Sequence, residues 1–164
     1  MKLRPGLGSM LLPLAFLLFD GRAFSNAPVG HYTLTTNTAV DTRTKLRWMR
    51  GFAPGGSSGS QTWTAGAQAC QALTLDGITG WRLPTTRELD TLYDWQKSSG
   101  NMWDNTVFQS APALGALTLW SATEVVGDAT KIEARSFLVR GYQQSNRNSL
   151  AKTDFAGVRC VRDP

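Results

Sequence analysis

Apolar and polar residues alternate along much of the last third of the chain, which is the pattern of β-strands. The alternation is clearest over residues 131–139, and the segments 117–123 and 158–162 are also predicted strands. Gly127-Asp128 has the composition of a turn between two of them. Residues 140–156 form a long polar connection. We therefore expect an antiparallel sheet in this part of the protein.

The first half of the chain changes to helical spacing after a short strand-rich start. Residues 32–34 and the two arms of 39–49 are predicted strands. In the segment 63–73, inward-facing residues recur every three or four positions, which predicts a helix with one buried face. That face consists of Trp63, Ala67, Cys70 and either Leu73 or Thr74. A second helix is predicted over residues 86–96.

The stretch 80–89, GWRLPTTREL, joins these elements. Trp81 is a large apolar anchor, and Pro84 favours an extended conformation before it. Thr85 followed by Glu88 is a capping box, in which each side chain accepts a hydrogen bond from a backbone N–H at the helix start. We predict structural roles for Trp48, Trp81, Arg82, Leu83, Pro84, Thr85, Glu88 and Trp120.

The N-terminus has the composition of a secretory signal peptide. Lys2 and Arg4 precede an apolar run over residues 10–19, which is too short to span a bilayer. Small residues around position 25 predict cleavage after Ser25, with cleavage after Ala27 as the alternative; a buried N-terminal helix is the competing interpretation. No cysteine for a lipid anchor lies near this site. We expect residues 1–25 to be removed and a product without a membrane segment to reach the periplasm or the exterior.

The charge of the processed chain argues against nucleic-acid binding. Removal of Lys2, Arg4, Arg22 and Asp20 takes 17 basic and 12 acidic residues to 14 and 11, a net charge of +3. A charge this small does not indicate a nucleic-acid partner.

The two cysteines, Cys70 and Cys160, suggest one disulfide bond in an oxidising compartment. Two buried free thiols are the alternative.

Catalytic constellations are not evident in the sequence. We assign residues 26–38 to an N-terminal tail that includes the first strand, and the single histidine, His31, falls in this tail. A zinc site needs more His or Cys ligands than the chain has. Asp90 and Asp94 lie four apart on a predicted helix, which is more typical of a solvated face than of a metal site. We predict a non-enzyme without metal or cofactor.

Five separated strings resemble the motifs of one family. They are Val40-Asp41-x-x-Thr44-x-Leu46-x-Trp48, Trp-x-x-x-Ala-x-x-Cys-x-x-Leu from Trp63, WRLPT..EL from Trp81, Trp-Ser-Ala-Thr from Trp120, and the terminal VRCVR. Their order over residues 39–162 resembles the Lcl-type C-terminal domain family, named for a Legionella collagen-like adhesin. Lys45 stands where that family usually has glycine.

The resemblance implies an α+β fold, with two helices packed on an antiparallel sheet in a C-type-lectin-like or formylglycine-generating-enzyme-like architecture. It also implies an exported binding module for extracellular glycans, because the adhesin binds sulfated glycosaminoglycans. Residues suited to such a ligand are Arg135, Arg140, Arg147, Lys152 and Arg159, with Trp103 for stacking on a sugar. A catalytic relative of the formylglycine-generating fold and a structural domain that contacts a surface protein are the alternatives. The oligomeric state is not predicted.

Overall fold

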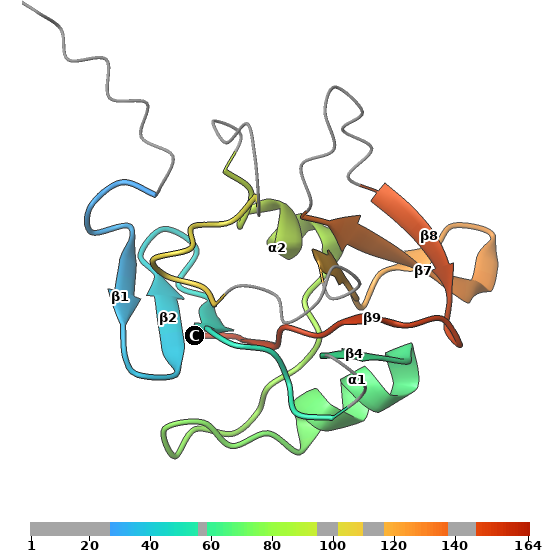
Figure 1. Cartoon of the computed structure of the whole chain (residues 1–164), viewed down its shortest axis with the longest axis horizontal. Coiled ribbons are helices and arrows are strands. Elements are labelled where there is room, and N and C mark those ends of the chain that lie inside the picture. Colours follow the sequence, from blue (N-terminus) through green and yellow to red (C-terminus); the bar gives the residue numbers. More distant parts are fainter. Residues whose placement is uncertain (1–26, 56–58, 95–101, 110–116, 138–146) are drawn as a thin grey trace, which may run out of the picture.

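The computed structural model describes residues 27–55, 59–94, 102–109, 117–137 and 147–164. Within these ranges the protein is α+β, with two helices and two β-sheets. Figure 1 shows the smaller sheet on the left, around β1 and β2, and the larger sheet on the right, around β7 and β8. The predicted signal peptide and its cleavage site lie outside the described residues. None of the helices described here has the length and apolar character to cross a bilayer.

The smaller sheet joins the beginning of the domain to its end. Its order is β1 (Tyr32–Leu34), β2 (Thr38–Asp41), β3 (Arg47–Met49) and β10 (Val161–Arg162), and all neighbours are antiparallel. Ala39 and Trp48 face each other across β2 and β3, and Val161 pairs with Trp48 from the other side. All three side chains are fully buried. The predicted early strands and the closing strand are therefore confirmed, and they belong to one sheet.

The larger sheet has a mixed topology that the sequence pattern did not predict. Its order is β4 (Ser60–Gln61), β9 (Ala156–Gly157), β5 (Thr118–Leu119), β7 (Asp128–Ser136) and β6 (Glu124–Val125), and β8 (Arg147–Ala151) also pairs with β7. The β5–β9 pair is parallel, so the expectation of one antiparallel sheet was wrong. Part of the predicted polar connection is strand β8, because its backbone pairs with β7 over five residues although its side chains are mostly polar.

The two helices differ in how well their ends were predicted. Helix α1 (Trp63–Gln71) matches its prediction, whereas α2 (Thr86–Asp90) is a single turn that ends well before residue 96. The chain leaves α2 because Leu92 and Tyr93 are buried and the N–H of Asp94 donates to the carbonyl of Met102. A backbone contact to another segment thus replaces further helix.

The capping box at the start of α2 is confirmed. The backbone N–H of Glu88 donates to the Thr85 hydroxyl, and that of Thr85 donates to the Glu88 carboxylate. Trp81 is buried and its indole N–H donates to the carbonyl of Ile78 at 2.8 Å. The predicted structural roles of Trp81, Thr85 and Glu88 are therefore confirmed.

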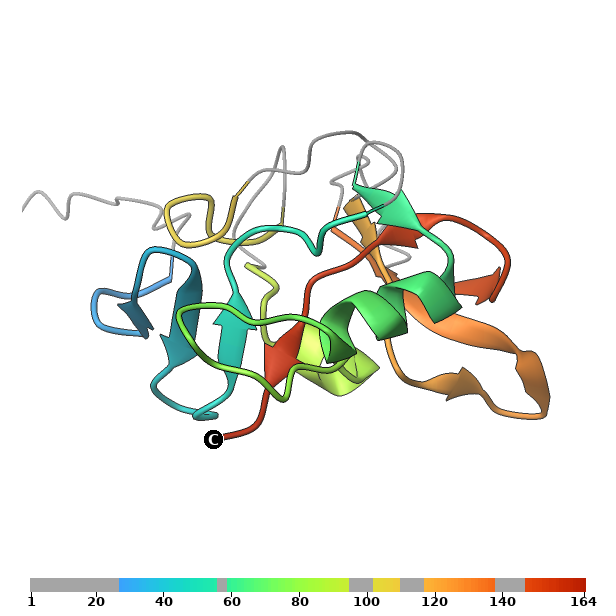
Figure 2. The same cartoon turned by 90° about the horizontal axis from the view of Figure 1, so that it is seen from below.

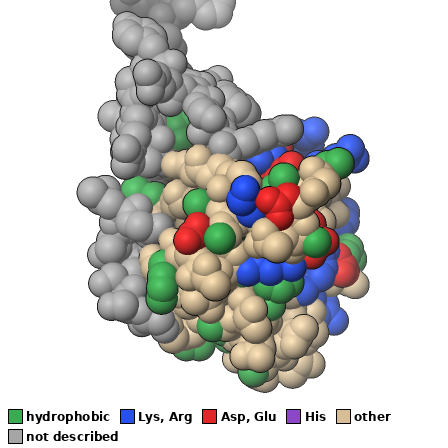
Figure 3. Space-filling view, turned by 90° about the vertical axis from the view of Figure 1, so that its right-hand side faces the viewer, with side chains coloured by type: hydrophobic (Ala, Val, Ile, Leu, Met, Phe, Trp, Pro, Cys, Tyr) green, Lys and Arg blue, Asp and Glu red, His purple; other side chains and the backbone are tan. Residues whose placement is uncertain are grey.

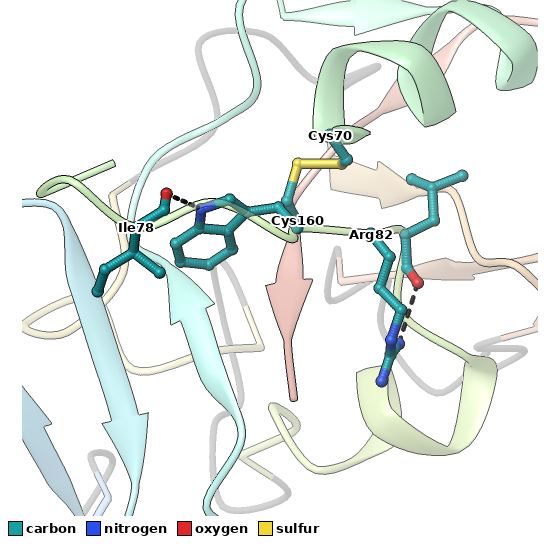
Figure 4. Close-up of a disulfide and its surroundings, with 6 residues drawn as sticks. Cys70, Ile78, Arg82 and Cys160 are labelled. Atoms are coloured by element: carbon teal, nitrogen blue, oxygen red, sulfur yellow. Dashed lines mark hydrogen bonds between the residues drawn. A yellow bond between two sulfur atoms is a disulfide. The ribbon is translucent and has the colours of Figure 1, made fainter. Parts of the chain in front are cut away.

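The Cys70–Cys160 disulfide is confirmed and ties α1 to the segment that enters β10. Figure 4 shows the bridge beside the corner that carries Arg82. Helix α1 also packs closely on this segment, because a Cβ on Gly66 would lie 2.6 Å from the Cγ2 of Val158. Figure 2 shows α1 in front of the strands when the protein is viewed from below. The buried apolar residues form two clusters, of which α1 packs on the one that contains Trp120. Trp48 is buried in the other, and both tryptophans are fully buried, as predicted.

Candidate functional site

Arg159, predicted as a ligand-binding residue, is fully buried. Its guanidinium donates to the carbonyls of Met49 (3.0 Å), Arg50 and Gln109 (3.2 Å). It therefore holds the end of β3 against the 102–109 segment. The prediction that Arg159 contacts a polyanion was wrong, because its side chain is fully buried and its Nη1 and Nη2 atoms donate inside the protein.

Three aromatic rings surround the same guanidinium. Phe52, Trp103 and Phe108 have their ring centroids 4.8–4.9 Å from its central carbon. Burial lowers the pKa of Arg159 to about 9, which still leaves the group charged at neutral pH. The rings stabilise this charge by cation–π attraction. Trp103 is itself fully buried, so its predicted stacking on a sugar is also wrong.

Arg135 is buried as well, against the predicted helix that carries Asp90. Its Nε and Nη2 donate to the two carboxylate oxygens of Asp90 at 2.6 and 3.2 Å. This bidentate pair uses the planar donors that were expected to bind sulfate. It also engages Asp90, and no group of three metal-ligating side chains occurs among the described residues.

The remaining predicted basic residues do not form a patch that the structure describes. Lys152 pairs with Glu124 at 2.9 Å and lies over the ring of Trp63. Arg140 lies outside the described residues, as does the side chain of Arg147. Figure 3 shows the face around β7 and β8, where positive and negative side chains are interspersed. The described part of the protein thus offers no concentrated positive surface on these strands.

A large open hollow lies at the other side of the molecule, beside β1. It has a volume of about 1070 Å³ and is lined by residues from three segments, 27–34, 91–94 and 104–107, together with Arg43. Tyr32 and Tyr93 supply aromatic surface there, and Asp94 and Asp104 supply carboxylates. Burial, together with the charges of Asp41 and Asp104, raises the pKa of Tyr32, so its phenol stays neutral.

A smaller hollow of about 170 Å³ adjoins the first and shares three of its lining residues, His31, Arg43 and Thr91. We call these three residues, with Asp41, the polar junction. The Nε2 atom of His31 lies 3.7 Å from the Oδ1 atom of Asp41. Asp41 is almost fully buried and accepts the backbone N–H groups of Arg43 (2.7 Å) and Thr44 (3.2 Å). The β2–β3 turn therefore fixes the carboxylate, and the carboxylate lies against the histidine.

The polar junction combines an imidazole, a guanidinium, a carboxylate and the hydroxyl of Thr91. The lining of the two hollows includes no serine and no cysteine. Both cysteines are in the disulfide and fully buried, so they are not available for thiol chemistry. The arrangement is suited to hold a polar ligand through donors and acceptors of both signs.

Residues 37–162 match the Lcl C-terminal domain family. The protein belongs to this family. The matched range contains the whole of residues 39–162, the range over which the motifs resemble this family. No curated protein sequence matches the chain.

Most anchors of the family motifs lie away from the hollows, although Asp41 and Thr44 of the first motif line the smaller one. Trp48, Trp81, Trp120 and Cys160 are buried in the core, and none of them lines either hollow. Strand β1, which forms one wall of the larger hollow, precedes the family match altogether. The motif tryptophans and Cys160 of this Lcl C-terminal domain therefore belong to the scaffold, whereas one wall of the larger hollow lies outside the family match.

Sequence reasoning missed the polar junction because it assigned His31 to a tail. The structure places His31 directly before β1. The first residue of that strand, Tyr32, pairs with Asp41. The signal was present as two short strands separated by the polar stretch 35–37. Reading them as a hairpin brings His31 and Asp41 to neighbouring positions.

Proposed function

We propose that the mature chain is an exported, non-catalytic binding module that holds an uncharged, hydroxyl-rich glycan at the polar junction. The observation that carries this proposal is the meeting of two hollows at His31, Arg43 and Thr91. Side chains of this kind donate to and accept from sugar hydroxyls, and Tyr32 beside them offers a ring face for the apolar side of a sugar.

The charges around the hollows favour a neutral ligand over a sulfated one. Asp94 and Asp104 line the larger hollow and Asp41 lines the smaller one, and Arg43 is the cation that lines both. Carboxylates that line a hollow repel a sulfate group bound in it, and the positive charge of one arginine does not outweigh three such carboxylates. We therefore propose a neutral sugar as the ligand, in place of the sulfated glycosaminoglycan that the resemblance implied.

The proposal also includes a C-type-lectin-like or formylglycine-generating-enzyme-like arrangement. Its support is the pairing of the terminal strand β10 with β3 and the disulfide from α1 to the segment before β10. The non-catalytic part of the proposal is supported by the disulfide, which leaves neither Cys70 nor Cys160 free for thiol chemistry.

A glycan array with the secreted, processed protein tests the function. We expect binding to neutral oligosaccharides that persists in the presence of a chelator and in moderate salt. Heparin retention that falls steeply with salt, without binding to neutral glycans, contradicts the proposal.

Two matched arginine substitutions locate the site. Arg43→Ala removes the cation of the polar junction, and Arg87→Ala removes an exposed arginine on α2 that lines neither hollow. We expect Arg43→Ala to weaken glycan binding about tenfold, which corresponds to about 1.4 kcal/mol. Arg87→Ala is expected to leave binding unchanged. Equal effects of the two substitutions, or none from either, would place the glycan elsewhere.

A further inference from the structure

Strand β1 is the outer strand of the smaller sheet, and Figure 1 shows it to the left of β2. Its register with β2 shows which backbone groups point outward. The N–H of Thr42 donates to the carbonyl of His31, and the N–H of Thr35 donates to the carbonyl of Thr38. In an antiparallel pair these bonded positions alternate with unbonded ones. The N–H and C=O groups of Tyr32 and Leu34 therefore point away from β2.

These outward groups have no hydrogen-bond partner among the described residues. At two other strand edges, neighbouring residues take up outward backbone groups. Arg82 exchanges two backbone hydrogen bonds with Val161 along the outer side of β10. At the end of β8, Ala151 donates its N–H to the Asp154 carboxylate and its carbonyl accepts the N–H of Asp154. The edge of β1 thus differs from two other edges by remaining open.

The open edge adjoins the larger hollow. Tyr32 and Leu34 lie two residues apart on the same face of β1, and both line the hollow. Leu34 is 45% exposed, and nearby Val29 is fully exposed. A strand placed beside β1 would bond to the outward backbone groups, while every second side chain would enter the hollow.

We propose that β1 accepts an extended peptide segment of a partner protein, which adds a fifth strand to the smaller sheet. Backbone hydrogen bonds would supply affinity and the hollow would supply selectivity, as in other strand-addition complexes. The side chains that enter the hollow are apolar or basic, because Leu34 and Val107 line it together with the carboxylates of Asp94 and Asp104.

A second copy of this chain fits the edge less well than a peptide does. Pairing of two β1 strands would join only three residues from each copy. A stable interface buries upwards of about 1,000 Å² in total, which two such short strands do not reach. A flexible peptide reaches a larger area because it also fills the hollow of about 1070 Å³.

Leu34→Pro is the sharpest test of the edge. Proline removes the N–H of residue 34, which points away from β2, and proline is tolerated at such outward positions of edge strands. The β1–β2 ladder therefore keeps its hydrogen bonds. Leu34→Ala is the matched control, since it removes the same side chain and keeps the N–H.

The probe is a phage-displayed library of random linear peptides, followed by synthesis of the selected sequences. We expect selected peptides to alternate apolar or basic residues with others, and their affinity to fall at least about tenfold in Leu34→Pro relative to Leu34→Ala. Methylation of alternate peptide nitrogens should produce a similar loss with the unmodified protein. This second measurement keeps the test decisive if Leu34→Pro does not fold.

Several results would overturn the inference. They are no selected peptide, equal binding by the two Leu34 variants, no effect of nitrogen methylation, or peptide binding explained by a concentration-dependent dimer. The proposal does not rest on glycan binding, because it uses the Leu34 end of β1 and the polar junction uses the His31 end. Neutral-glycan binding that survives Leu34→Pro while peptide binding is lost would separate the two sites.

Discussion

Two regions of this protein use their polar groups in opposite ways. The corner, defined as residues 80–89 with Cys160 and Asp163, directs its charged groups into the structure. Arg82 donates to both oxygens of Glu88, at 2.9 and 2.7 Å, and also pairs with Asp163. The rim, defined as residues 27–34 with Arg43, leaves backbone groups and side chains facing two hollows.

This difference separates stability from recognition. The corner carries the family motif, and its substitution should lower the free energy of unfolding without a direct effect on a ligand. The rim lies largely outside the family match, and its substitution should change binding with little effect on folding. The motif of the family therefore reports how the scaffold is built.

Loss of the disulfide should produce the largest effect on stability. Cys70 and Cys160 are 90 residues apart, and closing a loop of that length stabilises by about 4–5 kcal/mol in the chain-entropy model. We expect Cys70→Ser/Cys160→Ser to lower the free energy of unfolding by about this amount in urea titrations. Unfolding of the wild type under reducing conditions is the control. An unchanged midpoint would show that the bond is not formed in solution.

Arg159→Leu should have the second-largest effect on the free energy of unfolding. The substitution removes the donor to the carbonyls of Met49 and Gln109, and it removes one of the two donors to the carbonyl of Arg50, which keeps the N–H of Gln109. Each carbonyl left without a donor costs about 1–3 kcal/mol. We expect a loss of about 3–4 kcal/mol in urea titrations. Arg87→Ala, on the surface of α2, should change stability by less than about 0.5 kcal/mol. A small effect of Arg159→Leu would show that Arg159 does not hold the end of β3 against the segment 102–109.

Glu88→Ala should have an intermediate effect, because it removes a helix cap and the ion pair with Arg82. We expect a loss of about 1–2 kcal/mol at pH 7. Thr85→Ala removes the hydroxyl that accepts the N–H of Glu88 and keeps the ion pair with Arg82, which separates the two contributions.

The effect of Glu88 should depend on pH in a defined direction. Burial alone would raise the pKa of Glu88, but hydrogen bonds from Arg82 and Thr85 outweigh it and hold the pKa below the ordinary value. Its stabilisation is therefore complete above the unfolded pKa of about 4.3 and is lost as the pH falls through the folded pKa. The gap between the wild type and Glu88→Ala should narrow below about pH 4. A constant gap from pH 7 to pH 2 would contradict the assignment.

Rim substitutions should have the smallest effect on stability. Arg43→Ala and Leu34→Ala are expected to change the free energy of unfolding by less than about 0.5 kcal/mol, because both side chains are exposed. Thermal melts in parallel with the binding assays check this. A large loss of stability from either would remove the contrast between the rim and the corner.

Local sequence signals determined the corner and the disulfide. The capping box follows from the spacing of Thr85 and Glu88, and the turn before it follows from Gly80, which has a φ of +81°. Such signals depend on neighbours a few residues apart, so they survive into the folded protein. The family motifs likewise gave the domain limits and its α+β class.

The tertiary structure decided the roles of the arginines and the location of the hollows. Arg135 and Arg159 lie in a strand-rich, polar part of the sequence that is typical of a surface, yet both are buried. Their partners, Asp90 and the carbonyl of Met49, are 45 and 110 residues away in sequence. Burial of a charge depends on what packs around it, and local composition does not contain that information. The larger hollow beside the rim also depends on long-range packing, which brings the segments 27–34, 91–94 and 104–107 together around one space.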